Sequence, residues 1–222
     1  MKAFVRANKG FLMFMLLFGV FRTAVADWNP IPSASMRPNL LEGDVVLVNR
    51  LAYNVKLPLT DLVLARTGEP RRGDVVTFSS PADGTRLIKR ILALPGDRVE
   101  MRDERLTING VESQYALEEV VQEATEQGRL MDALRMSEVV DGRRHRIQVL
   151  PQREVMRDFG PVTVPPDAYL MLGDNRDNSA DSRYIGFVPR HLLIGRAERI
   201  LVSADYQGNW MPRTERFGQS LR

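Results

Sequence analysis

The sequence predicts a mostly β protein built from antiparallel sheet. Three Gly-Asp pairs, at Gly43, Gly73 and Gly96, each stand shortly before apolar and β-branched residues. Gly-Asp favours a turn and β-branched residues favour strands, so each pair marks a strand start. An apolar fraction of 44% with 27% charged residues is typical of a globular protein. Closely spaced turns between short strands indicate an antiparallel β fold.

Composition excludes several classes of function. The 222 residues suffice for one domain and an appendage. The chain has no cysteine, which excludes disulfides, thiol nucleophiles and cysteine metal sites. Net charge is +3, and no basic block is interleaved with aromatic residues, so we expect no nucleic-acid partner. Phosphate-loop and zinc-helix motifs are absent from the sequence, and we expect no metal and no cofactor.

The N-terminus has two interpretations. Residues 1–9 are basic, residues 10–21 are apolar throughout, and Arg22 interrupts the run. A basic start, a short apolar run and Ala24-Val25-Ala26 fit a cleaved signal peptide. Residues 10–26 can instead form a transmembrane anchor if Arg22 reaches the interface. Both interpretations place residues 27 onward outside the cytoplasm.

The next segment, residues 31–40, is a stiff loop. Pro32 and Pro38 bracket Ser33 and Ser35, and proline fixes φ and disfavours helix. Such a loop can hold a nucleophile, but it can equally carry ordinary surface serines.

Regular structure follows this loop. The stretch 115–140 is rich in Glu, Gln, Leu and Ala, which favours helix, although Gly128 interrupts it. The tail after residue 205 has few apolar residues, so it is either loose in solvent or rests on a membrane through Trp210 and Met211. We expect strands at 43–48, 75–78, 87–94, from 99, and at 106–110, 146–150, 160–164, 169–172 and 196–203, with a short helix at 189–193.

Lys89 is the most informative charged residue. Only four of the 31 basic residues are lysine, and Lys89 lies between Leu87 and Ile91 on one face of a predicted strand. Burial there would lower its pKa and yield a neutral amine able to act as a base, which arginine cannot do. The alternative is a lysine that extends from a half-exposed strand to solvent.

A serine nucleophile needs a base. His145 lies among arginines without a neighbouring carboxylate, and His191 follows Pro189-Arg190, so neither context resembles a triad. A Ser-Lys pair is a known alternative, for which Ser35 and Lys89 are candidates.

The loop at residues 173–183 is polar and follows an apolar strand. Asp174, Asp177 and Asp181 can pair with Arg176 and Arg183 and fix the loop, which would hold Ser179 against a buried amine. A calcium loop is less favoured, because no glutamate closes the pattern and two arginines oppose a cation.

Four stretches together resemble the type I signal peptidases, bacterial membrane-bound serine proteases with a Ser-Lys dyad. They are Pro32-Ser-Ala-Ser-Met-Arg-Pro38, Gly73-Asp-Val-Val, Ile88-Lys-Arg-Ile-Leu-Ala-Leu-Pro-Gly-Asp97 and Gly173-Asp-Asn-Arg-Asp-Asn-Ser-Ala-Asp-Ser-Arg183, in family order.

The resemblance implies roles for individual residues. Ser35 would be the nucleophile and Lys89 its general base. Ser33 and the Ser35 N–H would form the oxyanion hole, Ser179 would orient Lys89, and Asp181 and Arg183 would hold that loop. The pockets for small residues before the cleavage site would be lined by Ile31, Pro32, Met36, Leu40, Leu87 and Ile88.

The resemblance also implies an architecture. It favours an anchor, with residues 1–9 cytoplasmic, 10–26 spanning the inner membrane once and the rest periplasmic, and makes 24–26 a potential self-cleavage site. The catalytic β domain would comprise 27–108 and 165–205, with an inserted subdomain at 109–164 and a basic tail at 206–222. Expected partners are signal peptides and the bilayer, and the chain is expected to be a monomer. Two alternatives stay open: a specialised pilin or conjugation-type processing peptidase, and a non-catalytic exported β-rich binding module.

Overall fold

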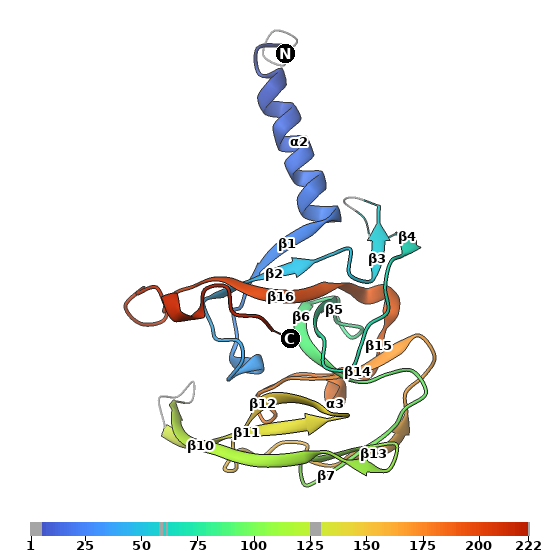
Figure 1. Cartoon of the computed structure of the whole chain (residues 1–222), viewed down its shortest axis with the longest axis vertical. Coiled ribbons are helices and arrows are strands. Elements are labelled where there is room, and N and C mark those ends of the chain that lie inside the picture. The colour runs from blue at the N-terminus through green and yellow to red at the C-terminus, as the bar shows by residue number, and fades with distance from the viewer. Residues whose placement is uncertain (1–5, 58–59, 61, 125–129, 222) are drawn as a thin grey trace.

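The computed structural model describes residues 6–57, 60, 62–124 and 130–221. A body of antiparallel sheets carries one helix that projects from it (Figure 1). The largest sheet has seven strands, each antiparallel to its neighbours, which confirms the predicted fold class. In spatial order they are β1 (Ala26–Pro30), β2 (Asp44–Asn49), β16 (Leu193–Ser203), β5 (Val75–Ser79), β6 (Arg86–Ala93), β14 (Ala168–Leu172) and β15 (Val188–Pro189).

Smaller sheets complete the body. One contains β13 (Phe159–Thr163), β7 (Arg98–Arg102), β8 (Arg105–Ile108) and β9 (Val111–Glu112); another contains β10 (Gln114–Ala124), β11 (Leu130–Val140) and β12 (Arg143–Val149); β3 (Asn54–Lys56) pairs with β4 (Val63–Arg66). The pairing of β13 with β7 joins residues on both sides of the boundary expected at 109. The inserted stretch therefore shares the four-stranded sheet with the preceding segment, whereas the sheet of β10, β11 and β12 lies entirely within it.

The expectation of helix at 115–140 is wrong. The stretch forms the long strands β10 and β11, with Gly128 between them outside the described residues. Glu119 lies opposite Arg135 across the two strands, and the side chains form an ion pair of 3.0 Å. Cross-strand pairing overrides the helix propensity of Glu, Leu and Ala.

The apolar N-terminal segment forms helix α2 (Lys9–Ala24), which ends two residues before the expected limit of the anchor at residue 26. Ala26 begins β1 instead, opposite Asn49 of β2. Arg22 pairs with Asp27 at 3.0 Å and stacks over Trp28. Within the part of the chain that the structure describes, no helix has the length and apolar character needed to cross a membrane.

Short helical turns connect the strands. They are η1 (Ala34–Met36), α3 (Ser182–Ile185), η2 (Arg190–Leu192) and η3 (Thr214–Arg216). The turn η2 lies at the predicted short helix, and η1 carries Ser35. Beneath η1, the buried Ile31, Met36 and Leu40 pack with side chains of β2, β5 and β16. This apolar cluster fixes the loop of residues 31–40, called the serine loop below, on the seven-stranded sheet.

The C-terminal segment packs against β16. Gly218 donates its N–H to Ile200, whose own N–H is donated to Gln219. Leu221 packs against the apolar cluster beneath η1. The described tail is therefore docked, although Trp210 and Met211 at its tip remain 71% and 61% exposed.

Candidate active site

Ser35 and Lys89 meet at the junction of η1 and β6. The side-chain nitrogen Nζ of Lys89 lies 2.7 Å from Ser35 Oγ and 3.0 Å from the carbonyl oxygen of Ile88. The residues are 54 positions apart in sequence, and both are buried, Lys89 with 2% of its surface exposed. A hydroxyl and an amine at this separation can exchange a proton directly.

The environment of Lys89 favours its neutral form. Burial lowers the pKa of Lys89 to about 8, since the charged amine loses its hydration. Asp181 and Asp174 oppose this shift, and Arg183 reinforces it. About a tenth of the amine is therefore uncharged at pH 7 and can accept a proton, far more than for a lysine in water.

Ser33 lies beside the pair at the start of η1. Its hydroxyl is 3.4 Å from Ser35 Oγ. Ser33 has extended backbone and is exposed, whereas Ser35 is the second residue of the turn. The N–H groups at the beginning of such a turn have no partner within it, so the Ser35 N–H is available as a donor.

The loop after β14 holds the serine loop in place. Asn175 donates its backbone N–H to the Ser35 carbonyl oxygen and its side-chain amide to the Ala34 carbonyl, each at 3.1 Å. Gly173 allows the close approach, because a Cβ there would stand 2.5 Å from the Ser35 carbonyl oxygen and would collide with Ser179. Glycine at position 173 is thus required for this contact.

A buried ion pair connects the same loop to β6. Arg90 donates to both carboxylate oxygens of Asp174, at 2.8 and 2.7 Å. Although burial disfavours the charged carboxylate, Arg90 holds the pKa of Asp174 below its usual value. The Asn39 amide also donates to Asp174, at 2.6 Å. One carboxylate therefore links the loop that carries Ser35 to the strand that carries Lys89.

Asp181 and Arg183 hold the far end of the loop. The Arg183 guanidinium donates to both carboxylate oxygens of Asp181, each at 2.8 Å. Asp181 also accepts the N–H of Gly173 at 3.0 Å, which ties the loop closed. Both side chains are fully buried.

Ser179 lies in this site without the predicted contact. Its hydroxyl packs against Gly173, is buried, and has no hydrogen-bond partner within the described structure. The structure thus brings Ser179 near the Ser35 carbonyl but does not bond it to Lys89.

The ion-pair lattice expected within the loop is only partly present. Asp181 pairs with Arg183, but Asp174 pairs with Arg90, and Asp177 accepts the Leu150 N–H at 2.7 Å. Arg176 donates to Glu138 of β11, which is fully buried. The loop is therefore fixed by charges from other strands more than by its own.

The interpretation that His145 has no carboxylate partner is also wrong. His145 lies opposite Glu138 across β11 and β12, with Nε2 2.9 Å from the carboxylate. Burial and Arg90 lower the pKa of His145. Among the described residues, no hydrogen bond joins this pair to Ser35 or Lys89, and Glu138 instead holds Arg176 of the loop after β14.

The predicted pocket residues fall into two groups. Ile31, Met36 and Leu40 are fully buried in the cluster beneath η1. Pro32 is exposed, and Leu87 and Ile88 are half-buried against two different core clusters. The latter three retain accessible surface.

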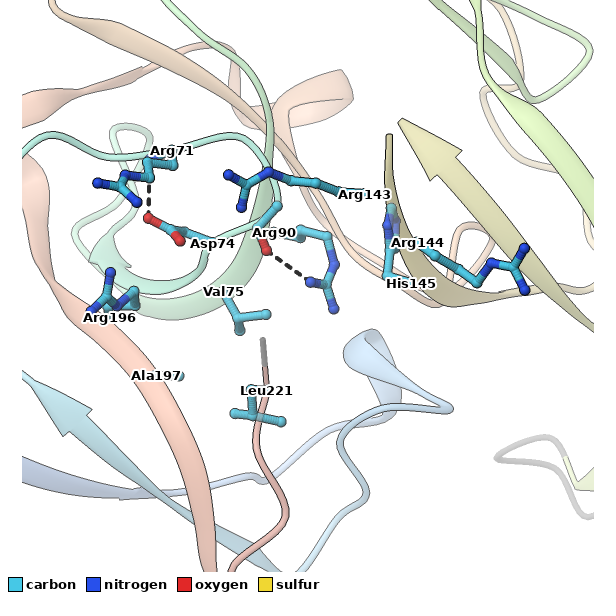
Figure 2. A pocket seen from close by; sticks show the side chains of 11 residues that line it. Arg71, Asp74, Val75, Arg90, Arg143, Arg144, His145, Arg196, Ala197 and Leu221 are labelled. Carbon is cyan, nitrogen blue, oxygen red and sulfur yellow. Dashed lines mark hydrogen bonds between the residues drawn. The ribbon is translucent and has the colours of Figure 1, made fainter. Parts of the chain in front are cut away.

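A cavity of about 310 Å³ is lined by eleven residues, five of which are arginines, and one of these is Arg90, the neighbour of Lys89 in β6. Figure 2 shows Arg71, Arg143 and Arg196 around it and Leu221 below Val75. Arg90, which also lines the cavity, donates to the carbonyl oxygen of Gly73. Neither Ser35 nor Lys89 lines this cavity. Within the described residues, no group of three His, Asp or Glu side chains is arranged to hold a metal ion.

Comparison with known proteins gives one consistent answer. A family model described as "Signal peptidase, peptidase S26" matches residues 4–202. A signal peptidase I of Pseudomonas aeruginosa is 34% identical over 96% of this chain and 78% of its own length. Those of Pseudomonas fluorescens and of Buchnera aphidicola (subspecies Acyrthosiphon pisum) are 35% and 31% identical, over 90% and 94% of this chain and 72% and 78% of their own lengths. These matches confirm the resemblance inferred from the four motifs. The chain belongs to the signal peptidase, peptidase S26, family.

Proposed function

We propose that this protein is a serine endopeptidase that removes N-terminal signal peptides from exported preproteins, with Ser35 as nucleophile and Lys89 as general base. The observation that carries the assignment is the 2.7 Å contact between Ser35 Oγ and a buried Lys89 Nζ. Family membership supplies the substrate class, and the contact supplies the chemistry.

The reaction begins with proton transfer. Neutral Lys89 takes the proton of Ser35, and the Oγ attacks the carbonyl carbon of the scissile bond. The tetrahedral intermediate collapses as the Lys89 ammonium gives that proton to the leaving amine, which departs with the mature protein. A water molecule then attacks the acyl carbon while neutral Lys89 accepts one of its protons. The bond from the acyl carbon to Ser35 Oγ breaks, the Lys89 ammonium returns the proton to Oγ, and the signal peptide leaves with a free carboxylate.

The developing oxyanion needs donors that are fixed before the reaction. The Ser35 N–H and the Ser33 hydroxyl are the two candidates, and both belong to the segment that Asn175 clamps. Rotation of the exposed Ser33 hydroxyl toward the substrate would complete this pair.

Specificity for small residues follows from the walls of the site. Pro32, Leu87 and Ile88 are partly accessible and would contact the residues before the cleavage site. Ile31, Met36 and Leu40 would support these walls from the core side, because they are fully packed. A rigid, close-packed apolar wall leaves room for a methyl group, whereas a larger side chain would clash with it.

Membrane attachment through α2 completes the proposal. The apolar side chains of α2 are exposed, among them Phe11, Phe14, Leu16 and Leu17. Insertion of this surface into the bacterial inner membrane would leave residues 27 onward on the periplasmic side. Residues 27–108 and 165–205 would carry catalysis, 109–164 would brace the loop after β14, and the protein would act as a monomer. Ser35 is at most about 30 Å of extended chain from Ala26, so cleavage would occur near the bilayer surface.

Incubation of the detergent-extracted protein with a preprotein tests this proposal. Wild type should release the mature protein, Ser35→Ala and Lys89→Arg should not, and all three should show the same circular dichroism spectrum. Turnover by folded Lys89→Arg would exclude the dyad. Cleavage confined to a pilin-type substrate would identify a specialised peptidase, and no cleavage by any form would favour a binding module.

A further inference from the structure

The C-terminal segment contacts the nucleophile loop through two arginines. Arg216 donates to both carboxylate oxygens of Asp44, at 3.0 and 2.6 Å, and to the Asn39 carbonyl oxygen at 2.9 Å. Arg213 donates to the Glu42 carbonyl oxygen at 3.0 Å. These contacts reach residues 39, 42 and 44, a short stretch that follows Ser35.

The contacts of Arg216 are built into the fold. Its side chain is 12% exposed and that of Asp44 is fully buried. Asp44 also accepts the Leu41 N–H at 2.8 Å, and its carbonyl accepts the Ile31 N–H at 2.8 Å. Asp44 therefore closes the base of the loop that begins at Ile31 and contains Ser35, and Arg216 neutralises its charge in a bidentate pair.

Asn39 is the point where three parts of the chain meet. Arg216 holds its carbonyl, while its side-chain amide donates to Asp174 and to the Arg146 carbonyl, at 2.6 and 2.7 Å. Asp174 in turn holds Arg90, the residue after Lys89. A continuous set of hydrogen bonds thus runs from Arg216 to the strand that carries the base.

The tail is held in place independently of these contacts. Backbone hydrogen bonds pair Gly218 and Gln219 with Ile200, and Leu221 with Glu198. Leu221 packs beside Val75 and Ala197 in the cluster beneath η1, as Figure 2 shows for these three residues. Arg216 therefore projects from an anchored segment and not from a loose end.

We infer that Arg216 is a positioning residue for the Ser35-Lys89 pair, acting through Asn39 and Asp44. The inference rests on the proposed function, since it assigns Arg216 to the same reaction. Loss of the bidentate pair between Arg216 and Asp44 would let the loop that carries Ser35 move, and water would then reach Ser35 and Lys89. A displacement of about 1 Å at a nucleophile costs on the order of a hundredfold in rate.

Arg216→Gln tests this inference, with Glu215→Gln as the matched control. Glu215 is an exposed neighbour whose side chain forms no ion pair in the described structure. Arg216→Gln should lower kcat about ten- to a hundredfold with KM nearly unchanged. It should also move the acid limb of kcat/KM to higher pH, because hydration of Lys89 would restore its usual affinity for a proton. The control should behave like wild type.

A merely structural role predicts a different outcome: a lower melting temperature, with kcat and the pH limb of the folded enzyme unchanged. That result would overturn the inference. If Arg216→Gln fails to fold, Arg216→Lys takes its place, because it keeps the charge but loses the two-pronged fork. It should show a smaller loss of kcat and the same direction of pH shift, and wild-type values for folded Arg216→Lys would refute the inference.

A second readout needs no substrate and separates this inference from the proposed function. Competitive acetylation of Lys89 against pH, followed by mass spectrometry, measures its proton affinity directly. A higher titration midpoint in the Arg216 variant supports the inference even if wild type cleaves no preprotein. An unchanged midpoint in an enzyme that does cleave would overturn the inference and leave the proposed function standing.

Discussion

The pH dependence of cleavage should report the ionisation of Lys89. Burial lowers the pKa of Lys89 from 10.5 to about 8, and only the neutral amine can accept the Ser35 proton. With a pKa of about 8, the neutral fraction rises from about a tenth at pH 7 to about nine tenths at pH 9. We therefore expect kcat/KM to rise about tenfold over this range and then to level off.

An unburied lysine predicts a different profile. With a pKa near 10.5, the neutral fraction at pH 9 would still be about 3%, so kcat/KM would rise about a hundredfold from pH 7 without a plateau. Initial rates on a peptide with alanine at the first and third positions before the scissile bond, below KM and at constant ionic strength, separate the two cases. Lys56→Arg, a lysine on β3 away from Ser35, is the matched control and should keep the wild-type profile. A rise of a hundredfold without a plateau, or a flat profile, would refute the assignment of Lys89 as the buried base.

Three further substitutions examine the packing of the site. Lys89→Met should abolish cleavage but raise the free energy of unfolding at pH 7 by up to about 3 kcal/mol, since the wild type must bury a charged amine at a pH below its folded pKa of about 8. This gain should vanish as pH rises from about 8 to 10.5, and a pH-independent gain in urea unfolding would contradict it. Ser179→Ala should leave stability unchanged or raise it by about 1 kcal/mol, because its buried hydroxyl is unpaired. A fall in kcat would show that Ser179 contacts Lys89 during the reaction although it does not in this structure, and an unchanged kcat would exclude a role in orienting Lys89. Gly173→Ala should lower both stability and kcat, because its Cβ would stand 2.5 Å from the Ser35 carbonyl, whereas Gly19→Ala, with open space around it, should change neither by much.

Local sequence located many of the strands and singled out the two residues proposed to react. Gly-Asp pairs before β-branched runs locate β2, β5 and β7, because turn chemistry and strand propensity act over a few residues. Lys89 stands out as a lysine among apolar neighbours, and Ser35 as a serine between prolines. The helix predicted at 115–140 failed because pairing of β10 with β11 overrode propensity.

The partners of the charged residues could not be derived from the motifs. Arg90 lies 84 positions from Asp174, and Arg176 lies 38 from Glu138, so sequence neighbours alone suggested a lattice that the fold builds differently. Asn39, Asn175 and Arg216 carry no local signal of the hydrogen bonds by which they hold the serine loop in place.

The sequence by itself determined the family and the mostly β fold class, and it singled out the two residues proposed as the dyad, since these depend on local motifs and residue chemistry. The tertiary structure alone decided that Ser35 and Lys89 lie 2.7 Å apart, that the amine is buried, and that the loop around them is held from β6, β11 and the C-terminal segment. The reason is physical: burial and charge pairing depend on which strands become neighbours, and residues far apart in sequence choose their partners only when the sheets close.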